Sequence, residues 1–497
     1  MLTTNYETPS WLPAAVILAG TFVSLWMEKL CQPGGKSLLR RPWHALAIHT
    51  GLFIVAWAIA LAVCRRPLFA LLAVLAGQLL IVQVSNAKHR ALREPFIFSD
   101  FGIFSQAIKH PRLYLPFLGV GRALLIGGAI CLAVAVGWLL EPPLESFAKW
   151  SALAAATGAT MLAISLPHSP LPSLEPAIDV SQRGLFASIA QYLLLEKKSA
   201  PRCTTAFRRV SKREADLPDI VVVQSESFFD PRRSFPGLRD DLLAHFDQAR
   251  TEANLHGQLS VPAWGANTMR PEFSFLTGIS PASLGIHRFN PYRRVARQPI
   301  RALPAVLREA GYRTTCIHPH PARFFRRDRA FPNLGFERFM DIREFRNAKK
   351  CGPYIGDEAV TDKVLEELSQ ANGPVFLFAI TMENHGPLHL EKVASEDAGQ
   401  FFTKVPPPSC RDLHVYLRHL RSTDQQLGRL RNSLRARSRP YVLVFYGEHL
   451  PSMPMVYEAL GVPDGKTDYF IESTTEGDRR AIDLDITELP ERVLDLV

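Results

Sequence analysis

Long apolar runs fill the first third of the chain and restrict its fold more than any other feature. Each of four runs carries at most one charged side chain and is close to the ~20 residues that cross a bilayer as a helix. These runs are residues 11–27, 43–64, 67–84 and 117–140. A fifth run, residues 150–166, is shorter and rich in Ala, Ser and Thr. The sequence therefore predicts a transmembrane domain of four or five helices over residues 1–166.

The residues that flank these runs indicate how the chain crosses the membrane. The first run lacks a basic start and a small-residue cleavage site, which predicts a retained anchor rather than a signal peptide. Basic side chains cluster after the first and third runs, and the positive-inside rule places those loops in the cytoplasm. Five spans would then leave the second half of the chain in the cytoplasm, whereas four spans, with residues 150–166 in the membrane interface, would place it outside.

The formal net charge of +10 raises the question of which anionic partner the chain contacts. Basic residues near membrane spans, facing anionic lipid, explain it, and no nucleic-acid motif is present, so we expect no nucleic-acid partner. The sequence has no CxxC pair, which argues against a cysteine metal site. The four cysteines after residue 166 permit disulfides outside the cytoplasm without requiring them.

The segments that border the membrane are amphipathic. Residues 94–108 mix apolar and polar side chains, which predicts an interfacial helix. Residues 167–216 form a linker that opens with several prolines, continues as an amphipathic surface helix over 183–198, and ends in a basic stretch. That stretch is either a solvated linker or a contact for anionic headgroups.

From residue 217 the pattern alternates between short apolar strands and amphipathic helices. We predict strands over residues 219–224, 313–317, 374–380 and 441–446. The predicted helices are residues 300–310, 357–370 and 411–434, with a closing helix within 478–497. Alternating helices and buried strands indicate an α/β sandwich over residues 217–497.

Acids and histidines follow every one of these predicted strands. They are Glu226, then His318 and His320, then His385, and last Glu448 with His449. Ligands of such sheets bind beyond the carboxyl ends of the strands, so these side chains predict one shared site. We expect His320 to be a loop histidine without a role.

A hydroxyl precedes another predicted helix, residues 271–277. Thr268 lies in a Gly- and Asn-containing turn, and a helix start suits an anion such as a phosphate. The local alternative is that Thr268 only caps the helix.

These residue types match metal-assisted phosphate chemistry. Glu226, Glu448 and His449 could hold one cation, with Mn²⁺ or Mg²⁺ favoured by the carboxylates and Zn²⁺ possible. The cation could activate the Thr268 hydroxyl as a nucleophile. His318 and His385 could hold phosphate oxygens or protonate a leaving group. Arg327 offers a fork for a phosphate, or else belongs, with Arg326, to a solvated basic turn.

Five ordered motifs carry a resemblance to a known family. They are Gln-Ser-Glu226-Ser-Phe, Asn-Thr268-Met-Arg-Pro-Glu, His318 followed by Phe-Phe-Arg-Arg327-Asp, Met-Glu-Asn-His385-Gly-Pro, and Tyr-Gly-Glu448-His449. Over residues 217–470 the chain resembles the lipoteichoic acid synthase and phosphoglycerol transferase family, which consists of membrane-anchored members of the alkaline phosphatase/sulfatase superfamily.

The resemblance implies an activity. Thr268 would be the nucleophile, and Glu226, Thr268, Glu448 and His449 would bind one Mn²⁺. His318, Arg327 and His385 would contact the phosphate. The family takes phosphoglycerol from phosphatidylglycerol at the outer face of the cytoplasmic membrane, so we expect a multi-pass inner-membrane protein with an extracytoplasmic catalytic domain. The acceptor would be a polyglycerolphosphate chain or a glycan.

One position departs from the family, which usually has Asp where this chain has Glu448. This departure leaves three interpretations open. They are a changed metal preference, a lower reaction rate, or a degenerate, non-catalytic protein. A phosphoethanolamine transferase and a phosphodiesterase or phosphatase are further alternatives. The sulfatase branch is disfavoured because its Cys/Ser-x-Pro-x-Arg motif is absent, and Thr268-Met-Arg-Pro stands in its place.

Overall fold

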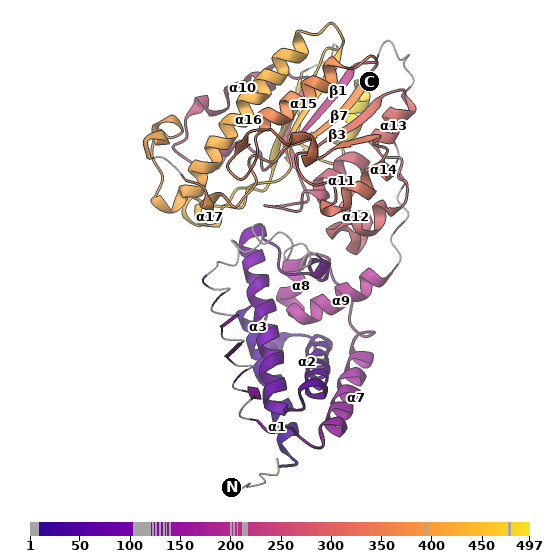
Figure 1. Cartoon of the computed structure of the whole chain (residues 1–497), viewed down its shortest axis with the longest axis vertical. Helices are drawn as coiled ribbons and strands as arrows, with labels where there is room; N and C mark the ends of the chain where they lie inside the picture. The colour runs from indigo at the N-terminus through magenta and orange to yellow at the C-terminus, as the bar shows by residue number, and fades with distance from the viewer. Residues whose placement is uncertain are drawn as a thin grey trace. The chain divides into compact units, whose positions relative to one another are not determined.

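The computed structural model divides into two compact units, Met1–Lys198 and Ser199–Val497 (Figure 1). The structure describes residues 9–102, individual positions between 121 and 138, residues 141–198, individual positions between 201 and 210, and residues 217–497 apart from 393–394 and 476–478. Most of the predicted span over 117–140, and residues 103–108 of the predicted interfacial helix over 94–108, lie outside these residues.

Within the described residues, four helices of the first unit are long and apolar enough to cross a membrane. They are α1 (Leu12–Met27, continued by a turn to Leu30), α2 (Trp43–Cys64), α3 (Pro67–Leu92) and α7 (Phe147–Ser165). Residues 150–166, for which both a span and an interfacial position were possible, thus lie in a 19-residue helix except for the last residue, which ends it. A Cβ on Gly158 would lie 2.8 Å from the Gly51 carbonyl oxygen, so α7 packs closely on α2 through two glycines.

Two shorter helices complete this unit, α8 (Pro176–Arg183) and α9 (Leu185–Lys197). Gly184 separates them with a φ of 91°, so the single helix predicted over 183–198 begins later, at Leu185. Ala187 of α9 packs against Ala45 and Ile48 of α2. Residues 167–198, predicted as part of a linker, therefore pack with the apolar helices.

The second unit is built on a nine-stranded sheet. The strands are β1 (Asp219–Ser225), β2 (Leu255–Ser260), β3 (Arg313–Ile317), β4 (Arg338–Met340), β7 (Val375–Ile380), β8 (Tyr441–Gly447), β9 (Thr467–Ser473), β10 (Arg480–Ala481) and β11 (Leu484–Asp485). Their order is β10-β2-β9-β8-β1-β7-β3-β4, with β11 also paired to β2. The five strands from β8 to β4 run parallel, and β9 is antiparallel to both neighbours. A hairpin of β5 (Lys350–Cys351) and β6 (Tyr354–Ile355) stands apart from the sheet.

Helices cover both faces of this sheet (Figure 1). Side chains of β1 alternate between two apolar cores, with Val221 in one and Val222 in the other. The first core also contains α10 (Ala244–Glu252), α15 (Asp357–Ser369), α16 (Arg411–Arg435) and α17 (Pro454–Leu460). The second contains α11 (Met269–Thr277), α12 (Pro291–Arg294), α13 (Leu303–Glu309), α14 (Arg327–Leu334) and α18 (Leu489–Asp495). The predicted α/β sandwich after an apolar helical region is confirmed.

The parallel strands end at one level of the sheet. Ser225 of β1 is in register with Gly447 of β8, and Gln224 with Ile380 of β7. Ile317 of β3 is in register with Ala379. The residues that follow these strands therefore emerge side by side, as the strand-end argument requires.

Candidate metal and nucleophile site

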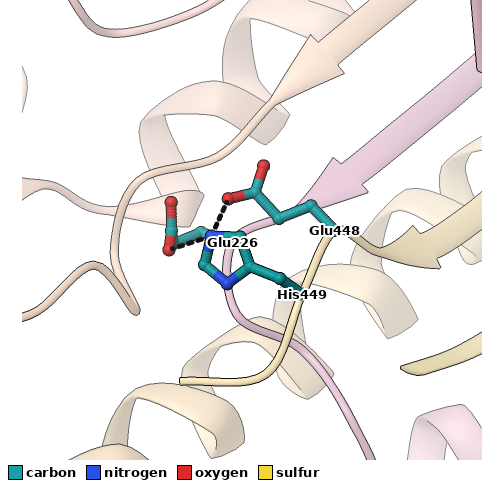
Figure 2. Close-up of side chains that lie close together, drawn as sticks. All are labelled: Glu226, Glu448 and His449. Carbon is teal, nitrogen blue, oxygen red and sulfur yellow. Dashed lines mark ion pairs between the residues drawn. The ribbon is translucent and has the colours of Figure 1, made fainter. Parts of the chain in front are cut away.

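Two carboxylates and an imidazole converge at the ends of β1 and β8 (Figure 2). His449 Nε2 lies 3.0 Å from Glu448 Oε1 and 3.9 Å from Glu226 Oε1. One ligand atom from each residue can be chosen so that all lie within 4.8 Å of one another. The three residues are at most 2% exposed. The structure therefore brings together three of the four predicted metal ligands in a small, buried cluster.

The charges of this cluster suit a cation. Burial, followed by the neighbouring Glu448, raises the pKa of Glu226 well above its ordinary value. Burial also acts to raise the pKa of Glu448, but His449, together with the hydrogen bonds to Glu226 and Gln224, outweighs it and lowers that pKa. Two buried carboxylates that repel each other are stabilised when a cation replaces the proton between them. Two carboxylates and an imidazole, with a hydroxyl nearby, are a donor set that fits Mn²⁺, Mg²⁺ or Zn²⁺.

Thr268, the predicted nucleophile, lies beside this cluster. It occupies the position before α11, yet its side chain makes no capping hydrogen bond. Its hydroxyl instead donates to Glu448 Oε1 over 3.3 Å. The Gly265 amide donates to the Leu450 carbonyl over 2.9 Å and so ties the Thr268 loop to the segment after β8. Unlike the three buried ligands, Thr268 is partly exposed, as a group that must meet a substrate has to be.

Glu448 is held by a chain of buried polar groups. Its Oε2 accepts a hydrogen bond of 2.6 Å from Gln224 Nε2, and Gln224 Oε1 accepts one of 2.6 Å from the Tyr446 hydroxyl. This arrangement leaves Oε1 facing both Thr268 and His449. The extra methylene of Glu, relative to the usual Asp, is accommodated here without loss of the convergence.

His318 and Arg327 form a second buried pair, at the end of β3. His318 Nδ1 is 3.1 Å from the Ile380 carbonyl, which can only accept, so Nδ1 carries the proton. Burial, followed by Arg327, lowers the pKa of His318 well below its ordinary value and keeps the ring neutral. Its Nε2 is therefore an acceptor, and Arg327 Nη1 lies 3.3 Å from it.

Arg327 does not belong to a solvated turn. Its Nε and Nη2 donate to the Glu272 carboxylate over 3.0 and 2.9 Å, and both residues are at most 1% exposed. Glu272 also accepts a hydrogen bond of 2.6 Å from the Tyr292 hydroxyl. The fork predicted to grip a phosphate is thus occupied by a carboxylate, and its Nη1 edge lies against His318.

His385 follows β7 and is held on two sides. Its Nδ1 lies 2.6 Å from the Gly386 carbonyl, which fixes the proton on Nδ1, and the Tyr354 ring packs 5.0 Å from its own. Burial lowers the pKa of His385, and the charges on Glu448 and His449 also act on it. The neutral ring therefore has an unprotonated Nε2.

Several contributing residues were not predicted. Glu272 carried a signal, because it is the only acidic residue of the helix that follows Thr268. Gln224 lies in a buried strand, where a polar side chain is also unusual. His419 of α16, which binds Glu383 and Glu391 on either side of His385, carried no local signal. Of the described cysteines after residue 166, Cys316, Cys351 and Cys410 are unpaired, and Cys203 lies outside the described residues.

Comparison with known proteins places this site in a family. The Sulfatase family model matches residues 218–477. The capsular polysaccharide biosynthesis protein RkpI of Rhizobium meliloti (strain 1021) is 29% identical over 462 residues, which cover 87% of this chain and 81% of the relative. A putative cyclic β-1,2-glucan modification protein of the same strain is 30% identical over 251 residues, 50% of this chain and 38% of the relative.

A solved structure shares the fold along the whole chain. The integral membrane lipooligosaccharide phosphoethanolamine transferase A (EptA) of Neisseria meningitidis superposes with a TM-score of 0.59 at 14% identity, over 98% of this chain and 95% of that one. The predicted membership of the alkaline phosphatase/sulfatase superfamily is confirmed, and the chain belongs to the Sulfatase family.

Proposed function

We propose that the chain is a membrane-anchored phosphotransferase with Thr268 as its nucleophile, and that it moves phosphoglycerol from phosphatidylglycerol to a glycan or polyglycerolphosphate acceptor. The observation that carries this proposal is the placement of Thr268. Its hydroxyl leaves the helix it precedes uncapped and points at Glu448, within a buried cluster of two carboxylates and an imidazole. Residues 217–497 are the proposed catalytic domain.

Glu226, Thr268, Glu448 and His449 are the residues that would hold one divalent cation, which we propose to be Mn²⁺. When bound there, a cation lowers the pKa of the hydroxyl and offsets phosphate charge. Gln224 keeps Glu448 Oε2 occupied, so that Oε1 remains directed at Thr268. The hydrogen bond from Thr268 to Glu448 also holds the hydroxyl in one orientation for attack.

The first half-reaction forms a covalent adduct on the chain. Thr268 Oγ1 attacks the phosphorus of the donor, and the bond from phosphorus to the diacylglycerol oxygen breaks. The proton of the hydroxyl ends on the diacylglycerol that leaves, and phosphoglycerol remains on Thr268. Nucleophilic catalysis of this kind divides one difficult displacement into two easier ones.

The second half-reaction returns the enzyme to its starting state. An acceptor hydroxyl attacks the same phosphorus, and the bond to Thr268 Oγ1 breaks. The unprotonated Nε2 of His385 is suited to take the proton of the acceptor hydroxyl and to return it to Thr268. We propose that the Nη1 edge of Arg327 donates to a phosphate oxygen, and that His318 and His385 contact the phosphate oxygens when Nε2 of each ring is protonated.

The comparisons support the choice of substrates. RkpI is named for capsular polysaccharide biosynthesis, and the second relative for modification of a cyclic glucan, which favours a cell-envelope glycan as the acceptor. EptA, whose fold matches along the whole chain, is a phosphoethanolamine transferase, so phosphatidylethanolamine is the second candidate donor. We place the catalytic domain outside the cytoplasmic membrane, as the resemblance to the phosphoglycerol transferase family implies.

A donor comparison tests the proposal. The full chain in vesicles is supplied with Mn²⁺, a soluble glucan, and either phosphatidylglycerol or phosphatidylethanolamine labelled in the headgroup. Diacylglycerol release with label on the glucan from phosphatidylglycerol supports the proposal, and label only from phosphatidylethanolamine would transfer the assignment to the second candidate. Release of label to water alone would indicate a phosphodiesterase. A protein that binds no divalent cation and releases nothing would be a degenerate member.

A reporter fused after residue 216 tests the placement of the domain. Activity of an exported reporter is expected, and activity confined to a reporter that works only in the cytoplasm would overturn the placement. This experiment also decides between an odd and an even number of spans.

A further inference from the structure

A buried histidine outside the cluster joins both ends of the loop that carries His385. His419 of α16 is 2% exposed. Its Nδ1 lies 3.3 Å from Glu383 Oε1, and its Nε2 lies 3.0 Å from Glu391 Oε2. Glu383 precedes His385 by two residues, and Glu391 follows it by six. One imidazole therefore contacts the chain on both sides of a proposed catalytic group.

The two contacts require a charged ring. A carboxylate only accepts hydrogen bonds, so both ring nitrogens must carry protons for both contacts to form. The pKa of His419 is correspondingly raised to about 9, because the two carboxylates outweigh the burial that acts to lower it. The other charged or titratable groups beside these three side chains include Asp357 of α15, Cys351 of β5 and Tyr354 of β6. Arg418 binds Glu391, and its Nη2 also lies 3.4 Å from His419 Nε2.

Other contacts also support the loop. The Asn384 amide donates to Thr423 Oγ1 over 3.3 Å, and Leu388 is buried in the first core. Glu383 Oε2 accepts hydrogen bonds from the Asp357 amide over 2.8 Å and from the Ser422 hydroxyl over 3.2 Å. The Tyr354 hydroxyl donates to the Gly386 carbonyl over 3.1 Å, next to its ring contact with His385. His419 is the group that links Glu383 with Glu391 directly.

We propose that protonated His419 is a positioning residue that clamps residues 383–391 and so fixes His385 beside the cluster. Its effect on turnover rests on the function proposed above, but the clamp itself does not. Loss of the ring proton would leave one nitrogen lone pair facing a carboxylate, a repulsive contact in a buried place. The clamp is then expected to open as a unit, not to weaken at one end only.

The dependence on pH follows from the direction of the shift. The pKa of His419 is higher in the folded chain than the ordinary value near 6.5, so the stabilising effect of the clamp is fully present below about 6.5. It is lost as pH rises through about 9. A neutral side chain at this position would remove that dependence.

Hydrogen exchange tests the clamp without using activity. The full chain in detergent micelles at pH 7.5 is compared with His419→Gln, and with His414→Gln as the matched control. His414 lies on the same helix, and its ring packs against Phe401 and Phe402. Amides of residues 384–391 are expected to exchange about ten-fold faster in His419→Gln alone, since a charged hydrogen bond at each end is lost. Equal exchange in all three proteins would overturn the proposal.

Kinetics then test the role of the clamp. In His419→Gln, kcat is expected to fall about ten-fold with KM for the donor nearly unchanged, because His385 is misplaced while the donor still binds. His419→Lys, which stays charged to higher pH, should restore part of kcat and move the alkaline limb of the pH profile upward. Faster loop exchange with unchanged kcat would refute the role in turnover and leave the nucleophile assignment standing. No turnover in any variant, the wild type included, would instead refute the proposed function.

Discussion

The hydroxyl of Thr268 donates to Glu448 Oε1 over 3.3 Å, across 180 positions of the chain, and makes no hydrogen bond to the helix that it precedes. A threonine before a helix ordinarily caps it, and loss of such a cap costs about 1 kcal/mol. In this chain the hydroxyl donates to a residue of the candidate metal and nucleophile site instead.

Thr268→Val should therefore separate activity from stability. The variant keeps the shape of the side chain and is expected to lose transfer by at least about a thousand-fold, as removal of a nucleophile does. Its thermal midpoint should change little, because no cap is lost. Thr277→Val is the matched control, since the Thr277 hydroxyl donates to the Phe273 carbonyl over 2.7 Å. The control should be less stable and still active, and the opposite pattern would indicate a structural threonine at 268.

Shortening Glu448 should weaken the cation site even though the family usually has Asp there. In Glu448→Asp the carboxylate moves back by one methylene and can no longer bind Gln224 while facing Thr268. We expect the affinity for Mn²⁺, measured by titration calorimetry, to fall about 10- to 100-fold. Glu458→Asp, at an exposed position of α17, should leave it unchanged. Tighter binding by Glu448→Asp would show that the site is built for Asp and that our account of Glu448 is wrong.

The Glu272–Arg327 pair should be strongly coupled. Glu272→Leu leaves a buried guanidinium without its counter-charge, which is expected to cost about 3–5 kcal/mol of stability. The double variant Glu272→Leu/Arg327→Met should recover part of this loss, because neither charge is then buried alone. Thermal unfolding of the four proteins completes the cycle. Additive losses would mean that the two residues do not depend on each other.

Asp357 should make the folded chain less stable as pH rises. Burial, followed by the charge of Glu383, raises its pKa to about 7. The folded chain therefore holds a proton that the unfolded chain releases near pH 4, and stability falls between about pH 4 and 7. Asp357→Asn removes this pH-dependent loss of stability. The thermal midpoint of the variant should therefore exceed that of the wild type at pH 8, and the difference should shrink at pH 5. A difference that grows toward low pH would contradict the assigned direction.

The local sequence pattern was sufficient to predict the central strands of the sheet. β3 coincides with the predicted strand over 313–317, and β7 and β8 differ from their predictions by one residue at one end, because buried parallel strands are continuous apolar runs. β2 and β9 were not predicted. β2 contains His256, Gly257 and Gln258 and is mostly half-buried, so it is a strand because β9 pairs with it and not because of its own composition.

The residues of the site likewise divide into those that a local pattern predicts and those that it does not. Glu226, Glu448 and His449 follow strands directly, so a rule about strand ends was enough to bring them together. The partners of Arg327 and of the carboxylates that flank His385 lie farther along the chain. Glu272 is 55 positions from Arg327, and His419 is 36 positions from Glu383 and 28 from Glu391. Which buried acid meets which base depends on how helices pack on the sheet, and no local pattern in the chain encodes it.

The adduct on Thr268 is the most direct measure of the central claim. The full chain is incubated with phosphatidylglycerol and Mn²⁺ but no acceptor, then digested, and the peptide that carries Thr268 is examined by mass spectrometry. We predict a phosphoglycerol adduct on Thr268 that disappears when a glycan acceptor is added. Continued release of diacylglycerol by a Thr268→Ala protein, or an adduct on another residue, would contradict the account.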